Sequence, residues 1–473
     1  MIWSIAWKNL WRNRNRSLVV IVAVTLGIIS GVLLVGIMKG WVEQRVHDAI
    51  YNEMSHLQIH NTEYLKNEEI LLTVTDTSEL FRAVEALPSA AGWVRRTKIF
   101  AMVNTPWANS GFVINGIDPE KEKKVTEIYK NIVPGGGEYL KAGSRGEILI
   151  SDKTAELLKL KQYIVTEKSI NNLKDENFPV EIIARLESLK DRRFRSQKDF
   201  REALREQFNK KELDRYGLKI IDKALDYRLR NKIQVTISDI AGAPVQGTFR
   251  VCGIFKTRNG GFDQANAYIN SGDLADLYGG EVYTHEIAIM LKDPENMDQV
   301  KEYLTGISAG NSVNTWEELA PDAAMMNDYM VIYYFIFIGI IMLALAFGII
   351  NTMMMAILER TKEIGMLMAI GMNRIKVFSM IMTETIFLTI VGAIIGMLSG
   401  WLIVELLGKS GIHFSSWGEG FEAIGFSAVV YPVISADFFL FIIILVIVTA
   451  IISSIWPARK ALALNPVEAL RTE

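Results

Sequence analysis

Four segments of this chain carry no charged side chain, and they constrain its fold more than any other feature. They are residues 18–38, 329–358, 385–404 and 438–456. A helix rises about 1.5 Å per residue, so about 20 residues are enough to cross the roughly 30 Å of hydrocarbon in a bilayer. A buried helix of a soluble protein usually keeps a polar stripe, and these segments have none. The sequence therefore predicts an α-helical membrane protein with four transmembrane helices.

Lysine and arginine gather in the short flanks before the first span, between the second and third, and after the fourth. Short flanks rich in these residues stay in the cytoplasm. The first span is longer than the apolar core of a signal peptide, so an uncleaved anchor is expected. The predicted order is a cytoplasmic amphipathic N-terminal helix (1–16), transmembrane helix 1 (17–39), an extracytoplasmic domain (40–328), transmembrane helix 2 (329–358), a short cytoplasmic helix (359–376), transmembrane helix 3 (377–406), an extracytoplasmic loop (407–436), transmembrane helix 4 (437–456) and a cytoplasmic tail (457–473).

The extracytoplasmic block mixes strand and helix patterns, which predicts a large α+β domain between the first two spans. The expected strands lie at 55–60, 98–103, 111–117, 147–150, 231–238, 247–256, 266–269 and 285–291, and a glycine loop is expected at 135–137. Residues 161–230 are densely charged, and Phe200, Leu204 and Phe208 recur at helical spacing, which predicts a charged helical insertion. The basic cluster at 192–195 is interpreted as a solvated helix face, with a docking patch as the alternative.

Several classes of chemistry find no support in the sequence. Cys252 is the only cysteine, which excludes an intrachain disulfide, and its apolar neighbours indicate a buried strand residue. His56 and His60 would lie about 13 Å apart on a strand, too far to share one metal ion. The sequence Gly408-Lys409-Ser410 imitates a phosphate-binding loop, but Ile403 stands where the first glycine belongs. We therefore expect no enzyme activity, no metal site and no cofactor bound by this chain.

Two sets of glycines recur every fourth residue within the apolar spans. Small residues at this spacing let helix backbones approach closely in lipid. Tight packing within one bundle is the favoured interpretation, and a dimer seam is the alternative. The glycines are Gly27 and Gly31 in the first span and Gly392, Gly396 and Gly400 in the third.

Two glutamates flank the third span. Glu405 lies near its outer end, and Glu384 lies within about two turns of Lys376. A proton-coupled transporter would need a central acid, and the spans contain none. Both glutamates are therefore interpreted as interfacial anchors.

The stretch 359–372 begins with charged residues and continues with apolar ones. A simple polar loop would not need Ile364, Leu367, Met368 and Ile370, whereas an amphipathic helix that docks on a cytoplasmic partner would. The alternative is a helix that lies on the lipid surface.

The pattern Arg360-x-x-Glu363-Ile364-Gly365-x-x-x-Ala369-x-Gly371 resembles the coupling-helix signature of the MacB/FtsX/LolC-LolE-type ABC transporter permeases. The stretch Pro457-Ala458-Arg459-Lys460-Ala461-x-x-Leu464-Asn465-Pro466 is similar to the C-terminal pattern of that family. Within the family, residues 38–59 and 431–438 are most similar to the lipoprotein-releasing LolC/LolE branch. The insertion at 161–230 lies outside the usual pattern.

The resemblance implies a permease subunit that works by mechanotransmission in a bacterial inner membrane, with both termini cytoplasmic and the large domain periplasmic. It implies a cytoplasmic ABC ATPase partner that holds ATP and Mg, a second copy or a similar permease, and a periplasmic lipoprotein carrier. The residues expected to contact the ATPase are Glu359, Arg360, Lys362, Glu363, Ile364, Gly365, Met368, Ala369 and Gly371.

Extraction of lipoproteins from the outer leaflet of the inner membrane is the favoured task. An apolar groove for acyl chains is expected between the first two spans, although ordinary lipid-facing aromatics would give the same pattern. The alternatives are FtsX-like regulation of a peptidoglycan hydrolase and MacB-like efflux of peptides or drugs; a fused N-terminal ATPase, typical of MacB, is not expected. The groove residues are Leu33, Met38, Tyr329, Tyr333 and Phe337.

Overall fold

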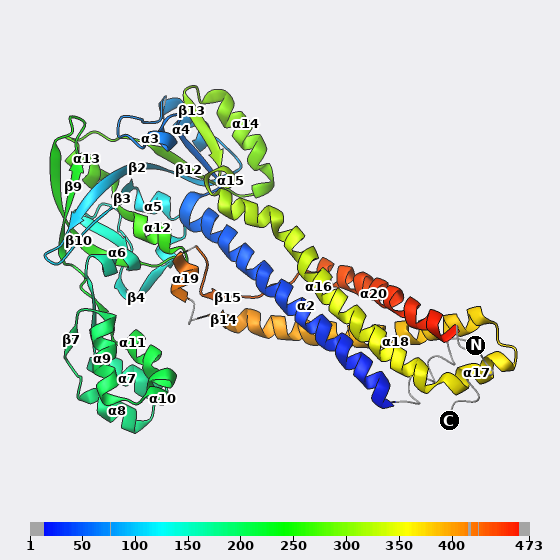
Figure 1. The fold of residues 1–473 in the computed structure, drawn as a ribbon. Helices are drawn as coiled ribbons and strands as arrows, with labels where there is room; N and C mark the ends of the chain where they lie inside the picture. Colours follow the sequence, from blue (N-terminus) through cyan, green and yellow to red (C-terminus); the bar gives the residue numbers. More distant parts are fainter. Residues whose placement is uncertain (1–13, 76, 415–417, 424, 463–473) are drawn as a thin grey trace. The chain divides into compact units, whose positions relative to one another are not determined.

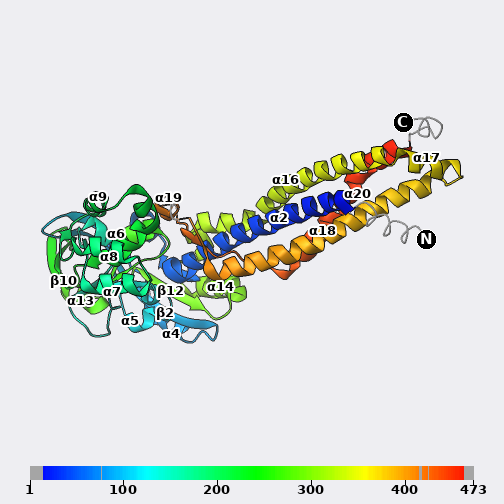
Figure 2. The ribbon, with the colours of Figure 1, turned by 90° about the horizontal axis from the view of Figure 1, so that it is seen from below.

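The computed structural model describes residues 14–75, 77–414, 418–423 and 425–462, which form two compact units (Figures 1 and 2). The helical unit contains the described residues up to 44, residues 325–418 and those from 428 onward. The sheet unit contains residues 45–324 and 419–427. Most of the N-terminal helix expected at 1–16 and most of the tail expected at 457–473 lie outside the described residues.

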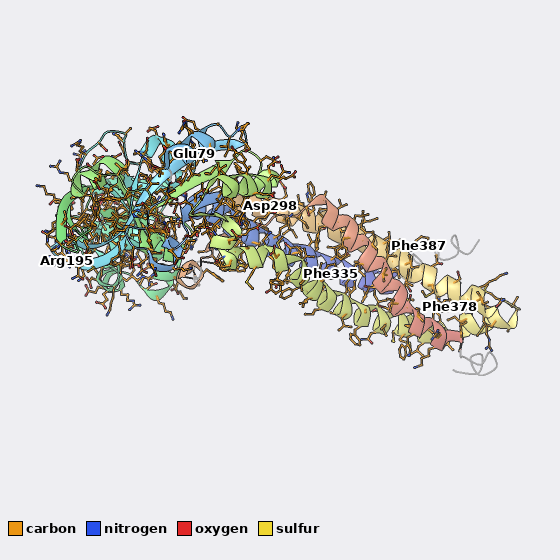
Figure 3. The ribbon with its side chains drawn as sticks, turned by 90° about the horizontal axis from the view of Figure 1, so that it is seen from above. Glu79, Arg195, Asp298, Phe335, Phe378 and Phe387 are labelled. Carbon is orange, nitrogen blue, oxygen red and sulfur yellow. The ribbon has the colours of Figure 1, made fainter. Side chains whose placement is uncertain are left out.

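Four long helices build the helical unit, and each is long and apolar enough to cross a membrane. The predicted fold class is confirmed. Side chains along these helices are mostly hydrocarbon, as Figure 3 shows for Phe335, Phe378 and Phe387. The long helices are α2 (Arg14–Asp48), α16 (Pro321–Glu359), α18 (Arg374–Ser410) and α20 (Ala436–Leu462), and the short α17 (Thr361–Ala369) joins α16 to α18.

The helices run beyond the predicted spans. α2 continues nine residues past the predicted end at 39, and α16 begins eight residues before the predicted start at 329. α20 likewise enters the stretch predicted as tail. Helix formation does not stop where apolar residues give way to charged ones, because charged side chains are compatible with helical backbone outside the hydrocarbon.

The glycines of α18 lie against α2. A Cβ atom on Gly392 would stand 2.9 Å from the Cβ of Val24, and one on Gly396 would stand 2.9 Å from the carbonyl oxygen of Thr25. The hydroxyl of Thr25 also donates to the carbonyl oxygen of Gly392 at 3.1 Å. Gly400 has the same relation to the next turn of α2, where its Cβ would meet Val32 at 3.0 Å. No side chain fits between the two backbones at these positions.

The glycines of α2 face a different neighbour. Added Cβ atoms at Gly27 and Gly31 would meet Leu345 and Ile341 of α16 at 3.8 Å and 3.7 Å, which is ordinary van der Waals contact. This face of α2 therefore tolerates a methyl group that the α18 ridge does not.

We predict that Gly396→Val lowers the free energy of unfolding by about 1–3 kcal/mol, because its side chain would push α18 away from α2. Gly339→Ala in α16 is the matched control, since no atom lies within 4 Å of its added Cβ. It should change stability by less than about 0.5 kcal/mol. Thermal unfolding of the detergent-solubilised protein, followed by tryptophan fluorescence, measures both. Equal effects of the two variants would contradict the packing described here.

A ten-stranded mixed sheet forms the centre of the sheet unit, in the order β13-β1-β12-β2-β3-β11-β5-β10-β4, with β9 paired to β10 and β2. The pairs β10–β5 and β11–β3 are parallel. The strands are β1 (Leu57–Asn61), β2 (Ala90–Asn104), β3 (Asn109–Ile117), β4 (Ile132–Gly137), β5 (Glu147–Ser151), β9 (Lys232–Ser238), β10 (Pro244–Phe255), β11 (Asn266–Asn270), β12 (Glu286–Leu291) and β13 (Asn311–Thr315).

Short helices accompany the sheet, which gives the α+β architecture that the sequence predicts. They are α3 (Tyr64–Asn67), α4 (Thr77–Glu85), α5 (Pro119–Glu122), α6 (Asp152–Leu157), α12 (Gly260–Ala265), α13 (Ser271–Leu277), α14 (Met297–Ile307), α15 (Trp316–Leu319) and α19 (Gly418–Ala423). The π-helix η1 (Ala49–Met54) follows α2 directly. In the helical unit, β14 (Ile412–His413) pairs with β15 (Val429–Val430).

The glycine loop expected at 135–137 is wrong, because these residues end strand β4. Gly137 pairs with Gly253 of β10 and has a φ of +89°. A Cβ atom on Gly137 would fall within 2.2 Å of the carbonyl oxygen of Cys252. The glycines therefore serve close backbone pairing in the sheet, which a composition-based loop signal cannot distinguish from a turn.

A buried ion cluster joins β12 to β2. Arg96 donates to Glu122 at 2.6 Å and to Glu286 at 2.5 Å, and Lys98 donates to Glu286 at 3.0 Å. Burial alone would raise the pKa of Glu286, but Lys98 and Arg96 lower it to about 2. Burial also lowers the pKa of the neighbouring His60 to about 4. Because each charge in this cluster faces an opposite one, removal of one partner would leave an uncompensated buried charge.

Residues 161–230 form a lobe with its own core, which we call the helical lobe (Figure 1). Besides the expected helices it contains a three-stranded sheet in the order β7-β6-β8. The cluster at 192–195 lies on a turn and on β7, so the predicted helix face is wrong there. The elements are β6 (Lys161–Ile164), α7 (Glu167–Asp175), α8 (Val180–Glu187), β7 (Arg193–Phe194), α9 (Gln197–Gln207), α10 (Lys210–Glu212), α11 (Leu218–Ala224) and β8 (Leu225–Tyr227).

Candidate functional site

The connection between α16 and α18 is a helix held between two tight turns. The chain leaves helical geometry at Arg360, whose φ and ψ are −104° and 18°. α17 follows, and Gly371, with a φ of +97°, ends it in a conformation that glycine adopts at little cost. The side chain of Asn373 then accepts a hydrogen bond from the backbone nitrogen of Ile375 at 3.0 Å and caps α18. The sequence itself thus encodes a helix–turn–helix connection of fixed length.

Arg360 connects all three helices through its guanidinium. Its Nη1 donates to Glu384 of α18 at 2.9 Å, and its Nε donates to Glu363 of α17 at 2.9 Å. The side chains of Arg360 and Glu384 are only 13% and 4% exposed. A buried ion pair of this kind holds its partners in one geometry, because loss of either partner leaves the other charge unpaired.

This pairing corrects the interpretation of Glu384. The sequence suggested an interfacial anchor near Lys376, but Glu384 is buried inside the helical unit and pairs with Arg360. Glu405 differs, because it is half exposed and pairs with Lys409 one turn away at 3.1 Å. Glu384 therefore holds helices together inside the helical unit, whereas Glu405 makes only a local pair at the surface.

One face of α17 is packed against the long helices. Ile364 is 3% exposed and lies among Met353, Ile357, Met380 and Ile381 of α16 and α18. Met368 and Met372 follow at four-residue intervals and pack on the same apolar core. These residues seat α17 on the ends of α16 and α18.

The opposite face of α17 is open. Lys362 is exposed, Met366 is 53% exposed and Ile370 is 79% exposed. We call these three residues the outer face of α17. Apolar side chains this exposed on a helix beside charged residues are typical of a docking surface.

The expected partner contacts divide between the two faces of α17. Ile364 and Gly365 are buried within this chain, so their expected contact with a partner stays a prediction. Met368 is half-buried on the inner side, and Arg360 and Glu363 pair with each other. The exposed residues of the expected set are Glu359, Ala369 and Gly371. Met366 was missed, although its four-residue spacing from Lys362 and Ile370 places it on their face.

The residues expected to line a groove lie on α2 and α16. Tyr329, Tyr333 and Phe337 are exposed on this chain, and Leu33 and Met38 are half-buried. Exposed aromatics of this kind suit a lipid-facing surface as well as one wall of a groove. The groove stays a prediction.

The last turn of α2, which belongs to the sheet unit, makes a cluster of polar contacts there. Arg45 donates to Glu53 of η1 at 2.9 Å and to Asp322 of α16 at 3.2 Å. Asn259, in the turn before α12, donates to Glu53 at 3.0 Å. Arg258 adds a contact to Asp48 at 3.3 Å. The last turn of α2 and the first turn of α16 thus share one cluster, which we call the Arg45 cluster.

The sites considered for metals and thiol chemistry have structural partners. No group of three or more metal-ligating side chains lies close enough to hold an ion within the described ranges. His56 accepts a hydrogen bond from the backbone nitrogen of Leu291 at 3.1 Å, and His60 lies beside Gln58. Burial raises the pKa of Cys252 to about 12, which makes its thiolate scarce at neutral pH.

The sequence of the helical unit matches a known family. Residues 335–466 match the model described as FtsX-like permease C-terminal. This part of the chain is an FtsX-like permease domain. It contains residues 335–359 of α16, all of α17 and α18, and α20.

Curated relatives carry permease names. An uncharacterized ABC transporter permease of Methanocaldococcus jannaschii is 30% identical over 231 residues, which cover 48% of this chain and 55% of the relative. The ABC transporter permease YtrF of Bacillus subtilis is 29% identical over 236 residues, covering 48% and 52%. The macrolide export ATP-binding/permease protein MacB of Chlorobium luteolum is 37% identical over 126 residues, covering 27% and 16%. The match therefore spans about half the length of the first two relatives.

Two solved structures are similar to part of the chain. The extracellular domain of the noncanonic ABC-type transporter YknZ from Gram-positive bacteria aligns with 55% of this chain and 99% of its own, at 10% identity and a TM-score of 0.29. The periplasmic region of MacB from Actinobacillus actinomycetemcomitans aligns with 58% and 94%, at 8% identity and a TM-score of 0.29. The resemblance to ABC transporter permeases of the FtsX and MacB type is confirmed, and it rests on the helical unit. A specific likeness to the LolC/LolE branch is not part of it.

We predict that Glu384→Gln destabilises the protein by about 2–3 kcal/mol, because Arg360 keeps Glu363 but loses its buried partner. Glu405→Gln on the same helix is the matched control, and loss of its half-exposed pair should cost less than about 0.5 kcal/mol. Thermal unfolding in detergent measures both. A double variant Arg360→Gln/Glu384→Gln should lose less than the sum of the two single variants. Strict additivity would show that the pair is not coupled.

Proposed function

We propose that this chain is the membrane subunit of an ABC transporter complex. A separate cytoplasmic ATPase would bind ATP and Mg, and the chain itself would convert the movement of that partner into movement of the sheet unit. The observation that carries the proposal is α17, a short helix with an open apolar face that Arg360 locks to two transmembrane helices.

The seat of α17 supports transmission of force. A push on Met366 or Ile370 acts on a helix whose inner face is packed and whose ion pair reaches Glu384 inside α18. Packed interiors do not deform continuously, so a displacement of α17 moves the attached ends of α16 and α18 as well.

The continuity of two helices supports output on the other side of the membrane. α2 and α16 both run without interruption from the helical unit into residues of the sheet unit. Within the sheet unit, the Arg45 cluster holds the last turn of α2 to the first turn of α16. This arrangement supports mechanotransmission from a cytoplasmic loop to an extracytoplasmic domain.

The complex would sit in a bacterial inner membrane with both termini in the cytoplasm and the sheet unit in the periplasm. A second copy or a similar permease would form a dimer with this chain, which would bind two ATPase subunits. Positive charge in the short connection supports this orientation, since Lys362 lies in α17 and Arg374 and Lys376 follow it.

Extraction of lipoproteins from the outer leaflet is the task that we favour, with transfer to a periplasmic lipoprotein carrier. Open aromatic side chains on α16 offer an apolar surface to acyl chains. Export of a macrolide or peptide is the second candidate, and the relatives named MacB favour it. FtsX-like control of a peptidoglycan hydrolase is the third.

We predict that Ile370→Glu lowers ATPase co-purification and turnover at least about tenfold, because a buried interface does not accept an unpaired carboxylate. Val180→Glu on the helical lobe is the control, since Val180 is similarly exposed but lies in the sheet unit. The measurement is pull-down of the tagged permease followed by an ATP hydrolysis assay. Normal turnover with Ile370→Glu in a folded protein would remove the basis of the proposal.

We predict that acylated protein co-purifies with the complex and that Tyr333→Ala reduces its amount several-fold. Tyr303→Ala on α14 is the control, because Tyr303 is equally exposed in the sheet unit. Mass spectrometry of the purified complex identifies the bound species. Recovery of a macrolide or a hydrolase in place of acylated protein would favour the second or third candidate, respectively.

A further inference from the structure

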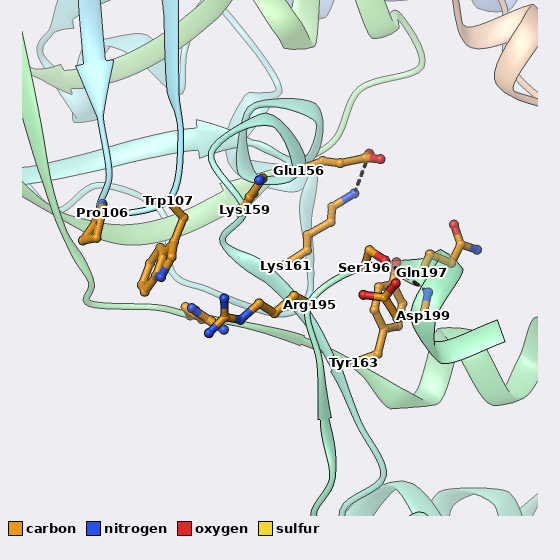
Figure 4. Close-up of a pocket in the computed structure, with 11 residues that line it drawn as sticks. Pro106, Trp107, Glu156, Lys159, Lys161, Tyr163, Arg195, Ser196, Gln197 and Asp199 are labelled. Carbon is orange, nitrogen blue, oxygen red and sulfur yellow. Dashed lines mark hydrogen bonds and ion pairs between the residues drawn. The ribbon is translucent and has the colours of Figure 1, made fainter. Parts of the chain in front are cut away.

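A cavity of about 570 Å³ opens in the sheet unit beside the helical lobe (Figure 4). The turn between β2 and β3 supplies Trp107 to its wall, and the residues between β7 and α9 supply Arg195 and Ser196. Cavities of about 300–1,000 Å³ are typical of ligand sites. The helical lobe and the main sheet thus build one concave surface that neither has alone.

The cavity wall has an excess of positive charge. Lys159, Lys161, Arg195 and Arg228 line it, against Glu156 and Asp199. Lys161 is already occupied, because it pairs with Asp152 at 2.8 Å. It also pairs with Glu156 at 3.4 Å (Figure 4). Across the part of the chain that the structure describes, neither Lys159 nor Arg195 makes an ion pair. The charge that remains unmatched is therefore mainly cationic, because Lys159, Arg195 and Arg228 stand against Asp199 alone.

Arg228 is held in place and still has donors to offer. Its guanidinium lies over the ring of Trp107 at 4.5 Å, and its Nε donates to Gln162 at 3.1 Å. Within the described residues, its two terminal nitrogens make no hydrogen bond. A guanidinium stacked on an aromatic ring is partly dehydrated and fixed in direction, which favours binding of a carboxylate.

The stacking of Arg228 on Trp107 also disfavours a sugar as the ligand. Saccharides stack on open aromatic faces, but Arg228 covers the ring of Trp107, and Tyr163 stacks on Phe200 at 5.7 Å. The groups that stay available are cationic donors spaced around a cavity with room for several residues of a peptide.

We propose that this cavity binds an acidic segment of a partner protein, with carboxylates that pair with Arg195, Arg228 and Lys159. Charge complementarity is the reason for this occupant. Asp199, which has no ion-pair partner among the described residues, would repel the carboxylates of the segment and so weaken its binding. The site lies in the unit placed outside the membrane by the proposed function, and it would recruit a partner there independently of ATP hydrolysis.

The test uses the full-length protein in nanodiscs of neutral lipid and a rhodamine-labelled hexaglutamate peptide, with binding measured by fluorescence anisotropy. Hexaglutamate should bind at least about tenfold more tightly than hexaglutamine, and added salt should weaken it. Arg195→Gln should lower the affinity about fivefold or more. Asp199→Asn should raise the affinity, because it removes the opposing carboxylate.

Arg205→Gln is the matched control, because Arg205 is an exposed arginine on α9 that does not line the cavity. It should change the affinity less than about twofold. Thermal unfolding verifies that all variants are folded. Equal losses for Arg195→Gln and Arg205→Gln, equal binding of hexaglutamine, or no binding of hexaglutamate would overturn the proposal. ATPase turnover is measured separately, so failure here is distinguishable from failure of the proposed function.

Discussion

Close approach of α18 to α2 is the contact on which the helical unit depends. At Gly392 and Gly396 the two backbones lie so near that even a methyl group would touch the carbonyl oxygens or Cβ atoms of α2. In lipid, hydrophobicity does not distinguish a neighbouring helix from an acyl chain, so association relies on close van der Waals contact and on hydrogen bonds such as that from Thr25 to Gly392. This contact fixes where α18 stands and hence where Glu384 can meet Arg360.

The ion pair between Arg360 and Glu384 fixes the packing of the helices at the end of the bundle where α17 lies. α17 would otherwise be a nine-residue helix between two turns, and isolated helices of that length are unstable. The apolar seat of Ile364 and the ion pair to Glu384 stabilise it from the tertiary side. Stabilisation of the inner face leaves the outer face free, which is why Met366 and Ile370 can stay exposed without loss of structure. Under the proposed function, this division allows the ATPase to bind the outer face of α17 and to move the helix as a rigid body.

The sheet unit uses charge in two different ways. Around Arg96 and around Arg45, buried cations meet buried carboxylates, and these contacts hold strands and helix ends in register. Around Arg195 and Arg228, cations line a cavity without enough carboxylates to match them. A protein interior compensates its charges because desolvation is costly. Lys159 and Arg195 are exposed and need no such compensation, so their charge stays available to the acidic ligand that we propose.

Local patterns in the sequence determined the spans, most strands of the sheet, and the position of α17, because lack of charge, alternation and glycine turns act over a few residues. The strand at 132–137 was missed, since its glycines pair with β10, more than a hundred residues away. Tertiary structure alone decided that Glu384 pairs with Arg360 and that Ile364 faces inward, because both depend on which helix stands beside which. Pairings between distant residues depend on the packing of whole elements, and no short stretch of sequence contains that information.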